Sequence, residues 1–124
     1  MLGEKKKIES YKVLEVWKKG VRFSIEIYKI SSGFPTSEQY GITNQIRRAS
    51  ASFPANISEG YGRESTKNYV RFLKTARGSL NETETFLYIA YGLKYISKES
   101  LENLLKKSTE LGKMMNSLIK SLTL

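Results

Sequence analysis

The residues whose types and spacing best suit a chemical task form a row of cations in the second half of the chain. Lys67, Arg71 and Lys74 follow one another at steps of four and three residues, with Arg63 before them and Arg77 after them. In a helix, this spacing places side chains on one face about one turn apart. Such a row can contact successive phosphates of a nucleic acid, and each contact releases a counterion. The alternative is the charged outer face that any bundle helix needs.

Acid–base and metal chemistry have far less support. The 124-residue chain contains no histidine and no cysteine, which removes the base of the usual catalytic triads and the ligands of most zinc sites. Glu59, Glu82 and Glu84 could suggest a carboxylate site, but di-metal bundles combine glutamates with Glu-x-x-His motifs. The glycine signatures of dinucleotide and P-loop binding do not occur either. We therefore predict no catalytic residue, no metal, no cofactor and no small-molecule substrate, so the protein is expected not to be an enzyme.

Two polar seams run beside the apolar faces of the expected helices. Their members recur at steps of three and four residues, and they mix amides, hydroxyls and opposite charges. A solvated face usually carries lysine and glutamate, whereas this mixture suits hydrogen bonding at a contact surface. The seams predict either a subunit interface or intramolecular networks between the second and third helices. The candidate interface residues are Gln45, Arg48, Ser52, Asn56 and Glu59 on one helix and Arg77, Asn81 and Glu84, continued by Tyr88, on the next.

Composition sets the broad class. The chain is the size of one domain, is 40% hydrophobic, and carries a net charge of +9 from 21 Lys and Arg against 12 Asp and Glu. This surplus attracts polyanions, although many small basic proteins bind nothing specific. No apolar segment follows Lys5, Lys6 and Lys7, and charges interrupt every later apolar run before about 18 residues. We expect no signal peptide and no membrane span, and hence a cytoplasmic protein.

Four helices must position these residues. Apolar side chains recur with helical period in segments of approximately 10–32, 37–60, 65–92 and 97–122. The connections are short, so neighbouring helices should run antiparallel. The sequence predicts an all-α fold in a single domain spanning 1–124, an up-down-up-down four-helix bundle. On the first helix the core stripe is expected to contain Val13, Val16, Trp17, Gly20, Ser24, Ile27 and Tyr28.

Local signals predict where the helices begin, bend and end. Gly33 can take a left-handed conformation that ends the first helix, and Pro35 prevents its continuation. Pro54 removes an amide hydrogen bond inside the second helix and should kink it, or else divide it into two shorter helices. Gly20 and Gly78 are expected to mark close helix approaches. The residues expected to cap helix N-termini are Thr36 or Ser37, Ser65 and Ser97.

Three stretches together resemble a known family. They read YKVLEVWKKGVRFSIEIYKI, FPTSEQYGITNQIRRASASFPANISEGYGR and YVRFLKTARGSLNETETFL. The ordered motifs Q-x-R-R-A, P-x-N-I-x-E-G-x-G-R and A-R-G-S-L-x-E resemble the bacterial four-helix-bundle proteins encoded within intervening sequences of 23S ribosomal RNA genes. The chain has Phe53 and Ser58 where the family pattern leads us to expect isoleucine and alanine. The matching motif positions are Gln45, Arg47, Arg48, Asn56, Glu59, Gly60, Arg63, Arg77, Gly78, Ser79 and Glu82.

The resemblance implies a four-helix bundle that assembles into a homopentamer, a ring of five subunits. It also implies a fold similar to the accessory variability proteins of diversity-generating retroelements, which are pentameric, basic and bind nucleic acid. The leading hypothesis is a homo-oligomeric protein associated with ribosomal RNA or another nucleic acid. The alternative is a protein–protein scaffold or accessory subunit whose basic surface is incidental. The phosphate contacts are expected from Arg47, Arg63, Lys67, Arg71 and Lys74.

Overall fold

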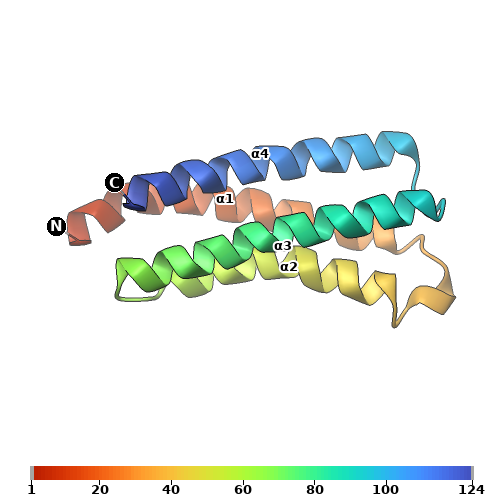
Figure 1. Cartoon of the computed structure of the whole chain (residues 1–124), viewed down its shortest axis with the longest axis horizontal. Helices are drawn as coiled ribbons and strands as arrows, with labels where there is room; N and C mark the ends of the chain where they lie inside the picture. The colour runs from red at the N-terminus through yellow and green to blue at the C-terminus, as the bar shows by residue number, and fades with distance from the viewer. Residues whose placement is uncertain (1, 124) are drawn as a thin grey trace.

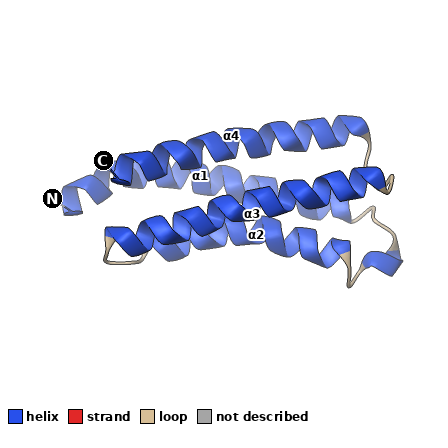
Figure 2. Ribbon diagram, viewed as in Figure 1, coloured by secondary structure: helices blue, strands red, loops and turns tan. Residues whose placement is uncertain are grey.

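The computed structural model describes residues 2–123, with side chains described from Val13 onward. It confirms an all-helical fold in which four long helices pack into one bundle (Figure 1). The helices are α1 (Leu2–Ser31), α2 (Ile42–Tyr61), α3 (Thr66–Gly92) and α4 (Lys98–Thr123). Each helix packs against the next along the chain, and α4 packs back against α1. The short loops in Figure 2 join helices that run in opposite directions.

The core lies where the four apolar faces meet. The predicted face of α2 is buried throughout, including Ile46, Phe53 and Ile57. The faces of α3 and α4 are buried along most of their predicted length as well. On α1, however, Trp17 is 38% exposed and Tyr28 is 44% exposed. The prediction that these two aromatic residues belong to the core is wrong, because the buried face of α1 is a neighbouring arc of the helix that contains Phe23.

Two helix starts follow their predicted caps. The Ser65 hydroxyl accepts a hydrogen bond of 3.1 Å from the Asn68 amide at the start of α3. The Ser97 hydroxyl accepts an equivalent bond from the Ser100 amide at the start of α4. Each bond satisfies one of the amides that the first turn of a helix leaves without a partner.

The start of α2 differs from the prediction. Thr36–Glu38 forms a short 3-10 turn instead of the first turn of the α-helix, and neither Thr36 nor Ser37 caps α2. Tertiary contacts explain the difference. The Tyr95 hydroxyl donates a 2.8 Å hydrogen bond to Glu38, which also raises the pKa of that phenol. The Tyr95 ring also packs against Phe34. These contacts hold the turn against the loop between α3 and α4.

Two further local expectations are settled by the backbone. α1 already begins at Leu2 and ends at Ser31. Gly33 does not take the left-handed conformation expected of it, since within residues 2–123 the residue with positive φ is Lys94, at 65°. α2 runs without a break through Pro54, so it is one helix and not two. A bend at Pro54 stays a prediction.

Candidate nucleic-acid interface

The predicted row of cations lies on the outer side of α3. Lys67, Arg71 and Lys74 are exposed and line a shallow surface depression of about 650 Å³. The depression lies where the start of α3 meets the end of α4, and Val70 and Leu122 contribute apolar lining. Because the helix begins at its Ser65 cap, the three side chains face outward at successive turns. The structure therefore places three cations around one open, concave surface.

Phe72 orders two of the arginines. The Arg63 guanidinium lies 4.8 Å from the centre of the Phe72 ring, and the Arg71 guanidinium lies 5.5 Å from it. Arg63 also donates a 2.7 Å hydrogen bond to Glu59. Stacking on an aromatic ring fixes the plane of a guanidinium while leaving N–H groups at its edge for an anion. Arg71 is thus oriented among the residues that line the depression, whereas Arg63 is not one of them and is partly occupied by the Glu59 carboxylate.

Arg47 lies apart from the other four predicted phosphate ligands. Its Nε donates a 2.8 Å hydrogen bond to the Ser31 hydroxyl, and its Nη2 donates to the Tyr28 carbonyl at 3.1 Å. The same guanidinium donates to Ser32 and stacks on the Tyr28 ring. The Tyr28 carbonyl also accepts the Ser32 amide at 3.2 Å, so Arg47 adds further hydrogen bonds to the last turn of α1. Arg47 therefore ties α2 to the end of α1, and its expected phosphate contact stays a prediction.

Replacing Arg47 with alanine is expected to lower the free energy of unfolding by about 2 kcal/mol, because hydrogen bonds from a charged group to the end of α1 are lost. Urea unfolding followed by circular dichroism measures the change. Arg47→Lys is the matched control for charge, and it should recover only part of the loss, since one ammonium cannot reproduce the planar fork. Equal stability of wild type and Arg47→Ala would contradict the stabilising role of these bonds.

The polar seam of α2 turns toward α3. The Asn56 side chain donates to both the carbonyl and the hydroxyl of Ser52 at 2.9 Å. The Ser79 hydroxyl on α3 donates to the Ser52 hydroxyl at 2.9 Å. Gln45 and Arg48, farther along the seam, are exposed. The centre of the seam is thus an intramolecular network, and its other end remains open to a partner.

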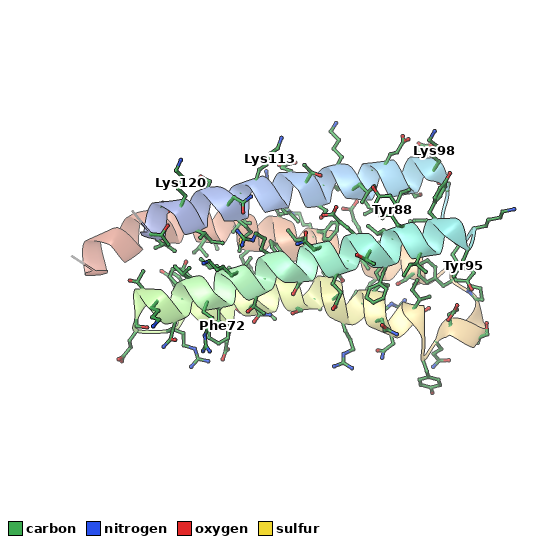
Figure 3. All side chains as sticks on the ribbon, in the orientation of Figure 1. Phe72, Tyr88, Tyr95, Lys98, Lys113 and Lys120 are labelled. Carbon is green, nitrogen blue, oxygen red and sulfur yellow. The ribbon has the colours of Figure 1, made fainter. Side chains whose placement is uncertain are left out.

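The polar seam of α3 turns toward α4 instead. Arg77 donates a 2.9 Å hydrogen bond to Asn116, and the Ser108 hydroxyl donates a bond of the same length to Glu84. Asn81 and Tyr88 on this seam are exposed, and Figure 3 shows Tyr88 extending from α3 on the side of α4. The two seams therefore do not form one network between α2 and α3. The subunit interface predicted for them stays a prediction.

The carboxylates considered for a metal site are separated. Glu59 is bound to Arg63 and Glu84 to Ser108, while Glu82 is exposed. Within the described part of the chain, no three acidic side chains gather as they would around an ion.

None of the helices between residues 2 and 123 is long and apolar enough to cross a bilayer.

Ion pairs link α1 to α4 on another side of the bundle. Lys19 binds Glu110 at 2.8 Å, and Lys107 binds Glu26. The hydrogen bond from Lys19 lowers the pKa of Glu110 and raises that of Lys19. Both charged forms are favoured by the pair. The charges of these two lysines are consequently balanced by their partners.

Sequence reasoning missed one surface. Trp17 and Tyr28, assigned to the core, lie on an exposed apolar strip of α1 that also contains Ile25. The signal was present in the sequence, since α1 has more apolar residues than one buried face can hold. Leu14, Val21 and Ile25 recur with helical period on a face other than that of the core positions. Recognising this second period would have revealed the exposed strip.

Comparisons with known proteins place the chain in context. The model of the family described as 23S rRNA-intervening sequence protein matches residues 12–117. A solved structure with a TM-score of 0.79 is that of a protein of unknown function from the S23 ribosomal protein family of Bacteroides thetaiotaomicron. The two chains share 32% sequence identity, and the match covers 88% of this chain and 98% of the other. No curated protein matches the sequence.

Proposed function

Because the chain belongs to the family of 23S rRNA-intervening sequence proteins, we propose that it is a non-enzymatic, cytoplasmic protein that binds structured RNA through phosphate contacts. The observation that carries this proposal is the set of Lys67, Arg71 and Lys74 around one surface depression. Arg63 stacks on the same Phe72 ring as Arg71. Cations at successive helix turns can each replace a counterion on a phosphate backbone.

The proposed contacts should recognise the shape of the RNA and not its base sequence. The proposed contacts are made by cationic side chains of one helix, and such contacts to phosphates set position without reading bases. Double-stranded RNA is recognised in this manner, through its phosphates and hydroxyl groups. We therefore expect similar affinity for RNA hairpins that share a fold and differ in sequence.

Filter binding of the wild-type protein to an RNA hairpin tests the proposal. With four phosphate contacts per chain, the logarithm of the association constant should fall with the logarithm of the salt concentration at a slope of about −3. A hairpin of the same shape and shuffled sequence is the control. Failure to retain either hairpin at about 0.15 M salt would exclude the function.

We also propose that the protein is a homo-oligomer, with the ring of five subunits that the family resemblance implies. The open end of the α2 seam supports such an assembly, because Gln45 and Arg48 are exposed beside a network of satisfied polar groups. A ring would multiply the net charge of +9 on each chain. It would thereby strengthen the attraction of the assembled surface for RNA.

Replacing Arg48 with alanine is expected to shift the assembly toward smaller species, since an interface loses most when a central charged hydrogen-bonding group is removed. Size-exclusion chromatography with light scattering measures the mass. Lys113→Ala is the matched control, because Lys113 extends from the side of α4 that faces away from α3 (Figure 3). An assembly of unchanged mass in Arg48→Ala would exclude the seam as an interface.

A further inference from the structure

Helix α1 presents two apolar faces, and the core covers only one. Val16, Phe23 and Ile27 are buried in the bundle. A second set recurs at steps of three and four residues, roughly 100° around the helix from the first. Its members are 38–49% exposed apart from the half-buried Val21. This set, which we name the α1 stripe, consists of Leu14, Trp17, Val21, Ile25 and Tyr28.

The α1 stripe borders an open groove between α1 and α2. The groove has a volume of about 560 Å³, and small side chains of α2, Ala51 and Pro54, form its far side. Two basic residues also line it: Lys29, which is exposed, and Arg47, whose guanidinium is bonded to the end of α1. Helix α2 contains no acidic residue between positions 42 and 58. An apolar groove with basic lining residues fits a partner helix that carries apolar side chains and a carboxylate.

The same chain carries a surface with those properties on α3. Phe86, Ile89 and Leu93 recur at steps of three and four residues, and Glu82 precedes them by one turn. Ile89 is 44% exposed and Leu93 is 51% exposed. Between residues 78 and 93 there are two glutamates and no lysine or arginine. We name Glu82, Phe86, Ile89 and Leu93 the α3 patch.

The two surfaces lie on different sides of the molecule. Helices α1 and α3 occupy diagonal positions, because each packs against both α2 and α4 (Figure 1). A two-fold contact of the α1 stripe with itself would bring like charges together and would leave the α3 patch uncovered. A head-to-tail contact covers both surfaces, and repetition of such a contact generates a ring when the rotation closes.

We propose that the α1 stripe of one copy receives the α3 patch of a second copy, so that Glu82 meets the basic residues of the groove. This proposal rests on the homo-oligomer proposed above and assigns its two contact surfaces. It also accounts for the open end of the α2 seam. The Ser52–Ser79 hydrogen bond sets the antiparallel register of α2 and α3. In this register Gln45 and Arg48 are level with Phe86 and Glu82, and the same contact would cover them.

Two variants of the full chain test the proposal by light scattering at about 100 µM. Ile25→Glu places a charge in the α1 stripe, and Ile89→Lys places one in the α3 patch. Each variant alone is expected to be a monomer of 14.2 kDa. An equal mixture should form a dimer and nothing larger, because each variant keeps one intact surface and the two intact surfaces are complementary. Tyr40→Ser, which removes an 89% exposed aromatic residue outside both surfaces, should leave the wild-type mass unchanged.

Several results would overturn the proposal. Wild-type mass in either variant would show that its surface is not an interface, although the oligomer itself would stand. A mixture that remains monomeric would exclude the pairing of stripe with patch. A monomeric wild type would exclude both this inference and the proposed oligomer. Loss of RNA retention in Ile25→Glu, with its mass unchanged, would assign the groove to nucleic acid. Circular dichroism verifies folding, and Leu14→Glu and Leu93→Lys replace any variant that fails to fold.

Discussion

Replacing Phe53 with alanine is expected to lower the free energy of unfolding by about 3–5 kcal/mol, the usual cost of removing a buried phenylalanine. Phe53 is 0% exposed and lies in the core of the bundle. Its ring covers α1 at Gly20, where an added Cβ would stand only 2.7 Å from two ring carbons. The ring and the glycine thus fill one space, and truncation leaves a cavity that the rigid helices cannot fully close. Denaturant unfolding at fixed protein concentration measures the loss.

The pairing with Gly20 gives this prediction an internal check. Gly20→Ala alone should destabilise the protein by about 1–3 kcal/mol, because a fixed ring cannot yield to the added methyl group. In the Phe53→Ala background the same change should be neutral or stabilising, so the double-mutant cycle should show a clear coupling energy.

Gly78→Ala is the matched control. Gly78 was expected to mark a close helix approach, but a Cβ there would meet nothing within 4 Å. Its replacement should stabilise the helix by up to about 1 kcal/mol. Additive effects of the changes at Gly20 and Phe53 would refute the shared packing.

Simultaneous replacement of Lys67, Arg71 and Lys74 with alanine is expected to weaken binding to an RNA hairpin on the order of 100-fold. This corresponds to about 1 kcal/mol for each lost contact. The salt dependence gives a more specific readout. The slope of the logarithm of affinity against the logarithm of salt concentration should become shallower by about 2–3, since three fewer counterions are released. Filter binding across a range of salt concentrations measures both quantities.

The control for that experiment removes the same charge elsewhere. Lys106, Lys113 and Lys120 are exposed on α4, and Lys113 and Lys120 extend from its outer side in Figure 3. Their joint replacement with alanine lowers the net charge equally, so only the general attraction to RNA should decrease. If both triple variants lose affinity to the same extent, the depression at the start of α3 is not the binding site. If neither loses affinity, the protein does not bind RNA through these faces.

The position of Phe53 illustrates what sequence comparison alone leaves undecided. The family pattern leads us to expect isoleucine there, and phenylalanine is a mild departure by type. The structure gives the departure a physical context, because the larger ring occupies the space left by Gly20 on the facing helix. Whether a larger core residue is tolerated depends on the residue that opposes it, which lies 33 positions earlier in the chain.

The sequence by itself determined the four helices, most of their buried faces and two of their starting points. These properties depend on residues within a few positions of one another: the helical period decides which side chains share a face, and a serine hydroxyl reaches an amide three residues ahead, as at Ser65 and Ser97. The row of cations on α3 was predictable for the same reason. Its exposure follows from the burial of the opposite face.

Only the tertiary structure decided how surfaces of different helices combine. The bonds of Arg47 to the end of α1 were not foreseen, because its partners Tyr28 and Ser31 come from another helix. The α3 seam meets α4 and not α2, through the bond from Arg77 to Asn116, 39 residues away. The choice of which apolar face of α1 enters the core, leaving Trp17 exposed, likewise depends on the rings that the other helices supply. Local spacing determines what a helix can present, whereas packing against distant segments determines what is buried, bonded or left for a partner.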